Sequence, residues 1–309
     1  MKAGCSMKPL LKFDTNGNFK IVQFTDLHEG PDKDKAIDLM NKILEYEKPN
    51  MVVLTGDNID GKCKTSDDVR NAINYIAEPM ENRSIPWCIV FGNHDDEHNM
   101  MTKEEMMKLY MTFEHNVSQI GYKTFDRIGN YNLLIESSKD NIPKFNIYMM
   151  DSGKYAPSFI GGYNWIKYTQ IFWYKRTALN LKQKYNEIIP SLMFFHIPLK
   201  KFKKVWDIGL INGEKNEEES CANINLCFFN TIYKTGDVKG VFVGHDHLNN
   251  YLTAINGIKL GYAGYTGYGG YGQDNIPRSA RVFLINESNP HNFKTWLRRE
   301  GHKQLASII

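Results

Sequence analysis

Cysteine is scarce in this sequence, and the few cysteines form no recognisable pattern. Their number among 309 residues is odd, and their spacing matches neither a zinc motif nor a disulfide framework. They are Cys5, Cys63, Cys88, Cys221 and Cys227. The scarcity argues against a disulfide-stabilised scaffold and a thiolate metal site, and it favours a reducing compartment.

Long apolar runs and a strong charge imbalance are also missing. No stretch approaches the roughly 20 continuous apolar residues of a membrane helix, and Met1–Lys12 lacks the apolar core of a signal peptide. The formal net charge of +3 is too small to make nucleic acid or a membrane the main partner. We therefore expect no stable nucleic-acid partner, no membrane span, and a cytoplasmic protein, or a secreted one if a leader has been removed.

What the sequence does contain is an alternation of strands and helices. Apolar runs at Phe19–Phe24, Met51–Thr55 and Trp87–Phe91 predict strands. Apolar residues at helical spacing predict helices over 32–48 and 69–80 between them. This β-α-β-α-β order is typical of parallel strands covered by helices.

Later segments break this alternation. Tyr131–Glu136 and Phe145–Met150 predict two strands with no helix between them, so we expect a mixed sheet. Further predicted elements are helices over 102–114, 165–185 and 223–234, a surface loop over 200–216, a hairpin around Asn256-Gly257, and strands over 280–286 and 292–298.

The domain organisation follows from these elements. With 42% hydrophobic residues, no internal repeat and no dividing linker, the sequence predicts one α/β domain over 1–309, with a core of about 20–298. We expect a four-layer αββα sandwich, in which two mixed β-sheets pack face to face with helices outside.

Five short polar motifs are the strongest signal, and each follows an apolar run that predicts a strand. The motifs are Asp26-Leu27-His28, Gly56-Asp57-Asn58, Gly92-Asn93-His94-Asp95, His196 and Gly244-His245-Asp246-His247. Strand ends that each deliver Asp, Asn or His predict one polar site at one rim of a sheet.

The residue types in these motifs are metal ligands. In an extended chain, residues two apart face the same way, so Asp26 with His28, and His245 with His247, can enter one cavity in pairs. Mixed nitrogen and oxygen donors without cysteine suit Zn, Fe or Mn. Seven candidates are too many for one tetrahedral ion and suit two ions, about 3.5–4 Å apart, that share a carboxylate. They are Asp26, His28, Asp57, Asn93, His196, His245 and His247.

Glycine precedes three of the ligands at sharp turns from strand to loop. At Gly56, Gly92 and Gly244 we expect either a positive φ or a close approach of the backbone to a neighbour.

The set resembles the calcineurin-like metallophosphoesterase superfamily. The motifs D-x-H, G-D, G-N-H-D, H and G-H-x-H occur in the superfamily's order between about Lys20 and Trp296. Flanking segments resemble the subgroup related to plant purple acid phosphatase 29 and the yeast phosphatase DCR2. These segments are Gly161–Ile166, Gln170 with Trp173, Phe194–Pro198, Gly240–His247, Gly261–Gly272 and Arg278–Val282.

The resemblance implies a role for each residue. Asp26, His28 and His247 would hold the first metal, while Asn93, His196 and His245 would hold the second. Asp57 would bridge the two ions. His94 would protonate the leaving group, and Asp95 would orient His94.

The resemblance also implies a dinuclear metal-dependent phosphoesterase. We expect hydrolysis of phosphate monoesters, on phosphoproteins or small molecules, by direct attack of metal-bound hydroxide. A phosphodiesterase acting on nucleotides or lipids is the first alternative, and a catalytically dead protein-binding scaffold is the second. Purple acid phosphatases carry a tyrosine ligand three residues after the bridging Asp, where this chain has Asp60. No tyrosinate colour is therefore expected, and the two ions remain open among Fe, Mn and Zn.

Two further patterns leave alternatives open. The lysines Lys200, Lys201, Lys203 and Lys204 either attract anionic substrates or form a solvated loop. The tyrosines Tyr262, Tyr265, Tyr268 and Tyr271, spaced by three among glycines, either supply a ring for a substrate or pack as a compact loop over the site. We expect Asp246 to be solvated or to lie behind the ligands.

Overall fold

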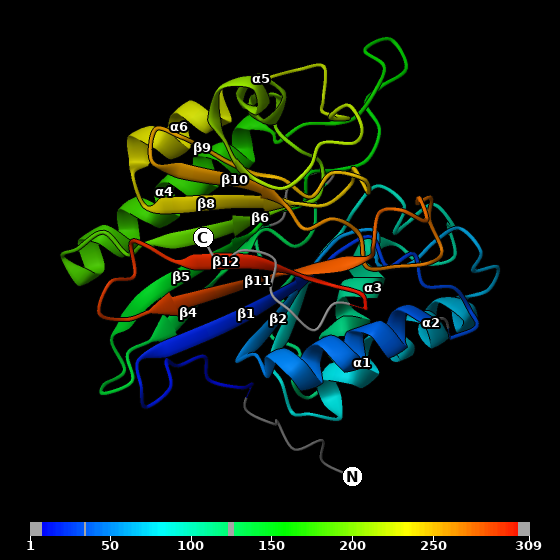
Figure 1. Cartoon of the computed structure of the whole chain (residues 1–309), viewed down its shortest axis with the longest axis horizontal. Helices are drawn as coiled ribbons and strands as arrows, with labels where there is room; N and C mark the ends of the chain where they lie inside the picture. The colour runs from blue at the N-terminus through cyan, green and yellow to red at the C-terminus, as the bar shows by residue number, and fades with distance from the viewer. Residues whose placement is uncertain (1–7, 34, 123–126, 302–309) are drawn as a thin grey trace.

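The computed structural model of this chain describes residues 8–33, 35–122 and 127–301. Its elements form two mixed sheets with helices on the outer faces (Figure 1). In chain order they are β1 (Asn18–Phe24), α1 (Lys35–Glu47), β2 (Met51–Thr55), α2 (Ser66–Glu81), β3 (Trp87–Val90), α3 (Lys103–Tyr110), β4 (Tyr131–Glu136), β5 (Pro143–Met149), α4 (Tyr168–Tyr185), β6 (Ser191–Phe194), α5 (Lys200–Gly209), β7 (Leu210–Asn212), α6 (Phe228–Thr235), β8 (Val238–Val243), β9 (Leu252–Ile255), β10 (Ile258–Tyr262), β11 (Ser279–Asn286) and β12 (Lys294–Arg299). The predicted α/β sandwich is confirmed.

The first sheet has the strand order β12-β11-β1-β2-β3. β1, β2 and β3 are parallel, β11 pairs antiparallel with β1, and β12 pairs antiparallel with β11. Every residue of β2 is buried, because α1 and α2 cover one face of this sheet and the second sheet covers the other (Figure 1). A strand covered on both faces reads as a continuous apolar run, which is why the sequence shows it so clearly.

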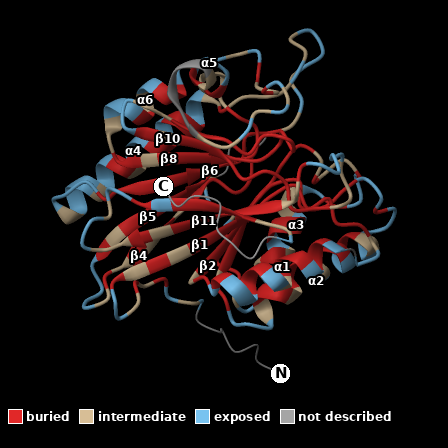
Figure 2. Ribbon diagram, viewed as in Figure 1, coloured by how far each residue is buried: buried red, intermediate tan, exposed pale blue. Residues whose placement is uncertain are grey.

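The second sheet has the order β4-β5-β6-β8-β10-β9-β7. Its four central strands β5, β6, β8 and β10 are parallel. Their outer side chains form a core with α4, α5 and α6. The inner faces of the two sheets meet through aromatic rings, since Phe283 of β11 packs edge-on against Phe194 and Phe242, with ring centroids 5.5 and 4.5 Å apart. Figure 2 shows the buried layer that results.

A predicted helix cap and a predicted turn are both found where the sequence placed them. Thr102 caps α3: its hydroxyl accepts from the Glu105 amide, and its own amide donates to the Glu105 carboxylate. The predicted hairpin is β9–β10, and Asn256 and Gly257 both have the positive φ that a tight primed turn requires.

The prediction of a surface loop over 200–216 is wrong. This segment forms α5 and the short strand β7. Phe202 and Val205 are fully buried and provide one apolar helix face at i, i+3 spacing. The lysines around them concealed that face in the sequence.

Some predicted helices also begin later than expected: α1 at Lys35, α4 at Tyr168 and α6 at Phe228. At the start of α4, the backbone amide of Lys167 donates to the side-chain oxygen of Gln170, which fixes the first turn of the helix. Four cysteines are free and unpaired, and Cys5 lies outside the described residues. In the described part of the chain, no helix combines the length and apolarity needed to cross a bilayer.

Candidate metal centre

The five polar motifs follow strands of both sheets. β1, β2 and β3 of the first sheet lead to Asp26, Asp57 and Asn93, whereas β6 and β8 of the second lead to His196 and His245. The expectation of a site on the rim of one sheet is therefore wrong. The carboxyl ends of parallel strands from two packed sheets converge on one place.

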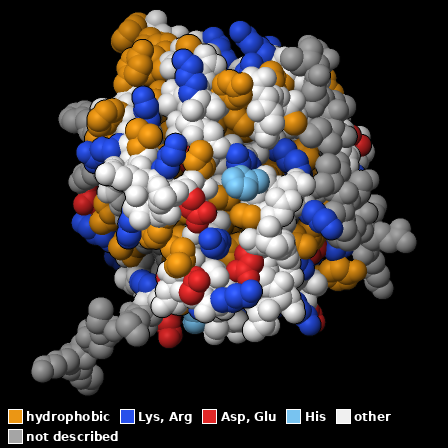
Figure 3. Space-filling view, turned by 90° about the vertical axis from the view of Figure 1, so that its left-hand side faces the viewer, with side chains coloured by type: hydrophobic (Ala, Val, Ile, Leu, Met, Phe, Trp, Pro, Cys, Tyr) orange, Lys and Arg blue, Asp and Glu red, His pale blue; other side chains and the backbone are white. Residues whose placement is uncertain are grey.

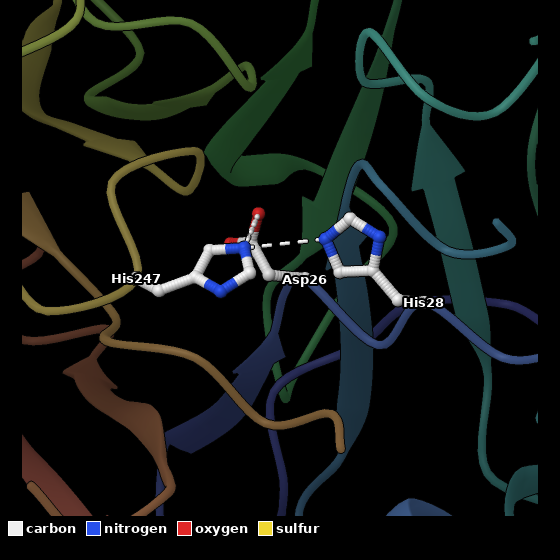
Figure 4. A group of neighbouring side chains, drawn as sticks. All are labelled: Asp26, His28 and His247. Carbon is white, nitrogen blue, oxygen red and sulfur yellow. Dashed lines mark hydrogen bonds and ion pairs between the residues drawn. The ribbon is translucent and has the colours of Figure 1, made fainter. Parts of the chain in front are cut away.

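Asp26, His28 and His247 form a first group of side chains that could hold a metal ion (Figure 4). All three are buried. His247 Nε2 lies 3.4 Å from Asp26 Oδ1 and 3.2 Å from His28 Nε2. Two imidazole nitrogens that face each other so closely need a proton or a cation between them.

Asp57, His196 and His245 form a second buried group. The Asp57 Oδ2 atom lies 3.0 Å from His196 Nε2 and 3.8 Å from His28 Nε2 of the first group. From this position one carboxylate reaches both groups, as a bridging ligand must.

Several buried polar atoms of the two groups and of Asn93 have no hydrogen-bond partner among the described residues, as expected of atoms that bind a metal ion. Both side-chain polar atoms of Asn93 and the Nε2 atom of His245 are buried without a hydrogen-bond partner in the described chain. Such a group costs about 1–3 kcal/mol when it stays unpaired. Imidazole, carboxylate and amide donors that converge without cysteine match Fe, Mn or Zn.

The backbone at four candidate ligands is unusual. Asp26, His28, Asp57 and His245 have φ values of 53°, 48°, 49° and 78°, in the left-handed region that side chains other than glycine rarely adopt. Each such residue costs of order 1–3 kcal/mol and persists where the surroundings impose it, most often at functional sites. Nothing in the residue types alone predicts this conformation.

Backbone carbonyls orient two of the histidines. His196 Nδ1 donates to the carbonyl of Thr55 at 2.9 Å, and His247 Nδ1 donates to that of Tyr271 at 2.6 Å. With Nδ1 occupied in this way, Nε2 is the nitrogen left for a metal.

Burial and neighbouring charge set the protonation of the second group. Burial alone would raise the pKa of Asp57, but the positive charge of His196 outweighs it and holds this pKa well below its usual value. Burial and the same His196 lower the pKa of His245 to about 3. Asp57 is therefore ionised and His245 neutral near pH 7, the forms that bind metals. Burial would lower the pKa of His196, but the charge of Asp57 raises it to about 9, so His196 must lose a proton when a metal binds.

The expected contact between Asp95 and His94 is absent from the described hydrogen bonds, so the predicted orienting role of Asp95 is corrected. The buried Asp95 carboxylate instead accepts from the backbone amides of Asp57, Asn58, Ile59 and Gly92. It fixes the turn that carries Asp57, because four converging amides hold a carboxylate firmly in place.

Glu97 is the carboxylate that contacts His94, with Oε2 2.5 Å from Nδ1. No motif in the sequence pointed to this residue. Its position three residues after His94, in a turn that brings the Glu97 amide to the His94 carbonyl, was the signal available.

The glycines before the ligands serve both expected purposes. Gly56 has a φ of +95°. A Cβ on Gly92 would lie 2.1 Å from Asp57 Oδ1, and one on Gly244 would lie 2.6 Å from Asp26 Oδ2. The ligand carboxylates therefore occupy the space that any other residue would fill.

The segment 266–272, here called the Gly/Tyr loop, packs against the first group. The Tyr271 ring stacks on the His247 ring with centroids 4.0 Å apart, and Tyr265, just before the loop, lies on the same ring at 5.4 Å. A Cβ on Gly270 would lie 2.5 Å from His247 Cε1 and 2.7 Å from His28 Cδ2. Of the two alternatives, a compact loop packed over the site describes what the structure shows.

The other residues singled out in the sequence lie around the site. Asp246 is buried behind the ligands, where it accepts from the Tyr262 hydroxyl, and burial raises its pKa to about 7. Lys200 donates to the Asn223 carbonyl and Lys203 pairs with Glu218, and none of the four lysines lines the metal cavity.

The metal cavity has a volume of about 310 Å³. It is lined by His28, Asp57, His94, Tyr163, Ser220, His245, His247, Gly269, Gly270 and Tyr271. Both groups and His94 therefore face the same space.

Comparison with known proteins agrees with this geometry. A family model described as calcineurin-like phosphoesterase matches residues 19–249, from the start of the first sheet to just beyond His247. The chain belongs to this family. Membership of the calcineurin-like phosphoesterase family explains both the order of the five motifs and their convergence on one place.

The alignments with two relatives cover most of this calcineurin-like phosphoesterase. An Arabidopsis thaliana protein named probable inactive purple acid phosphatase 29 is 34% identical over 96% of this chain and 86% of its own length. The Saccharomyces cerevisiae phosphatase DCR2 is 33% identical over 92% of this chain and 54% of its own length. A crystal structure of a Danio rerio dimetal phosphatase has the same fold, with a TM-score of 0.65 at 14% identity, covering 93% of this chain and 98% of that one.

Proposed function

We propose that this chain is a phosphatase that hydrolyses phosphate monoesters, on phosphoproteins or small molecules. The observation that carries the proposal is the complete donor set around Asp57, with His94 beside it. His94 is 37% exposed in the cavity, and its Nε2 lies 4.0 Å from Asp57 Oδ2. Two bound metal ions would supply Lewis-acid activation of a phosphate oxygen and of the attacking water.

The chain's own residues would hold and complete this centre. Asp26, His28 and His247 are the proposed ligands of the first ion, Asn93, His196 and His245 those of the second, and Asp57 serves both. His94 is the proposed acid. Glu97 holds Nδ1 of its ring, which leaves Nε2 to carry the proton that the leaving alkoxide takes up.

The first test compares p-nitrophenyl phosphate with bis-p-nitrophenyl phosphate after chelation and re-addition of Mn, Zn or Fe. We expect turnover that depends on metal and favours the monoester. Preference for the diester would move the protein to the phosphodiesterase alternative. No turnover of either ester with metal bound would support the scaffold alternative.

The role of His94 has its own test. His94→Ala should keep both ions and lose roughly 10²–10⁴-fold in rate, the usual contribution of a general acid. The loss should be smallest for a good leaving group such as nitrophenolate, and the exposed His291→Ala serves as control. Equal losses across leaving groups would argue against an acid role.

A further inference from the structure

The walls of the metal cavity carry no lysine or arginine side chain. None of its ten lining residues is Lys or Arg. A larger cavity of about 630 Å³ between α4 and α6 is lined by Lys175, Lys182 and Lys234, so the fold does provide basic walls elsewhere. Figure 3 likewise shows Lys and Arg among apolar side chains on the face at the left of Figure 1, where the parallel strands begin.

Lysines on the loops around the metal cavity are paired with carboxylates. Lys62 approaches the Gly269 carbonyl at 3.5 Å, but it pairs with Asp60 at 2.8 Å. Lys154 pairs with Asp96, and Lys215 pairs with Glu219. The guanidinium of Arg278 lies over the Tyr268 ring, 3.6 Å from its centroid. A substrate with several negative charges would find little there to offset them.

Two carboxylates, Glu97 and Glu217, contact lining residues and define what we call the mouth of the cavity; neither has a Lys or Arg partner in the described chain. Glu97 accepts from His94 and from the Tyr155 hydroxyl at 2.7 Å. Glu217 accepts from the Tyr271 hydroxyl at 2.9 Å and from the Leu248 amide.

Both carboxylates lie against residues of the cavity wall. Glu97 contacts His94, and Glu217 contacts Tyr271, and both of these partners line the cavity. In the described chain, the entrance beside Tyr271 therefore carries a negative charge that no Lys or Arg offsets.

Aromatic rings form the rest of the entrance. Tyr163 meets the His245 ring edge-on with centroids 4.3 Å apart, and Tyr271 stacks on His247. One tyrosine thus stands beside each group of candidate ligands. Tyr155 stacks on Tyr163 at 5.9 Å and extends the aromatic wall outwards.

We propose that the preferred substrate is an aromatic phosphomonoester with positive charge beside it, namely phosphotyrosine flanked by Lys or Arg in a peptide. This inference rests on the phosphatase function proposed above. The metal centre takes the phosphate, Tyr163 packs against the ring of the leaving group, and Glu217 faces the flanking cations. Acidic peptides and polyphosphates are disfavoured because like charges meet at the mouth.

The test measures kcat/KM on peptides that differ only in the flanks of phosphotyrosine, Lys-rich against Glu-rich, with matching phosphoserine peptides. Phosphotyrosine amide, which has no flanks, measures the ring alone. We expect the Lys-rich phosphotyrosine peptide to exceed the Glu-rich one by about fivefold, the upper range for an exposed ion pair. The ratio should shrink towards one at 1 M salt, where the Debye length is about 3 Å.

Two variants, each with a matched control, locate the preference. Glu217→Gln keeps an acceptor for Leu248 and Tyr271 and should lower the Lys/Glu ratio about twofold. Glu218→Gln, whose side chain is 72% exposed outside the cavity, should leave the ratio unchanged. Tyr163→Leu should lower the ratio of phosphotyrosine to phosphoserine turnover, whereas Tyr168→Leu on α4 should not. Each ratio is taken within one variant, so a general loss of rate cancels.

The outcomes separate this inference from the proposed function. Turnover of p-nitrophenyl phosphate with equal or reversed flank preference would overturn the inference and leave the phosphatase function standing. A preference that survives in Glu217→Gln and in 1 M salt would also overturn it. Absence of all monoester turnover with metals bound would overturn both.

Discussion

Strand ends hold the second group of candidate ligands, whereas a loop holds much of the first. His196 donates to the carbonyl of Thr55, the last residue of β2, and Asp57 is fixed by the buried Asp95. His247 instead donates to Tyr271 in the Gly/Tyr loop (266–272), which contains no regular element.

The difference lies in what must move before a ligand can move. Displacing His196 requires the end of a buried strand to shift, and that strand belongs to the core. Displacing His247 requires only the Gly/Tyr loop to open, and loops open at lower free energy than core strands. Similar donor sets can thus have unequal rigidity, and the following experiments test whether the two proposed ions differ accordingly.

Asp57→Ala should have the largest effect, because it removes the one carboxylate that reaches both groups. We expect the affinity for both ions to fall by more than the roughly 10–100-fold typical of losing an outer partner. Metal content measured by plasma mass spectrometry should drop from two equivalents towards none. Asp60→Asn, which alters a neighbouring buried carboxylate paired with Lys62, should retain both ions.

Chelation of the wild type comes next. Each ion bound at 100 times its Kd stabilises the fold by about 2.7 kcal/mol, so removal of both should lower Tm in two steps. We expect the first-group ion to leave at the lower chelator concentration. Calorimetry with metal analysis at each step measures the order, and simultaneous loss would contradict unequal support.

Gly270→Ala should separate the groups. Its new Cβ would lie within 2.7 Å of both His28 and His247, which must then shift. We expect roughly 10–100-fold weaker binding of one ion and one retained equivalent. Gly61→Ala is the matched control, because a Cβ there meets nothing within 4 Å and its φ is not positive. Loss of both ions in Gly270→Ala would show that the groups are coupled.

Tyr271→Phe should have the smallest effect. It keeps the ring on His247 and the carbonyl that binds Nδ1, but it removes the hydroxyl that accepts from the His247 amide and donates to Glu217. The loss of each such bond is worth about 1 kcal/mol. Competitive metal titration should show slightly weaker binding at the first group alone, with Tyr233→Phe on the α6 surface as control.

Much of this architecture was visible in the sequence because its signals are local. The runs before Asp57 and His245 are apolar and the run before Asp26 is mostly so, and buried parallel strands typically produce such runs. The assignment of strands to two sheets was not local. β1 pairs with β11, which lies near the other end of the sequence, and no residue type in either strand predicts this pairing.

The residues that hold the candidate ligands and His94 in place were harder to predict than the ligands themselves. Asp95 stands beside His94 in sequence, yet its carboxylate turns to backbone amides, while Glu97 reaches the ring. The left-handed conformation of Asp26 and the stacking of Tyr271 on His247 are set by tertiary contacts. Such contacts override what the local residue types favour.

The division of the centre between two sheets also orders events during synthesis. Asp26, Asp57 and Asn93 leave the ribosome well before His245 and His247, at the usual ~5–20 residues per second. The early half offers oxygen donors and His28 but lacks the later imidazoles. We therefore expect the full set of candidate donors to form only once strands from both halves of the chain have packed.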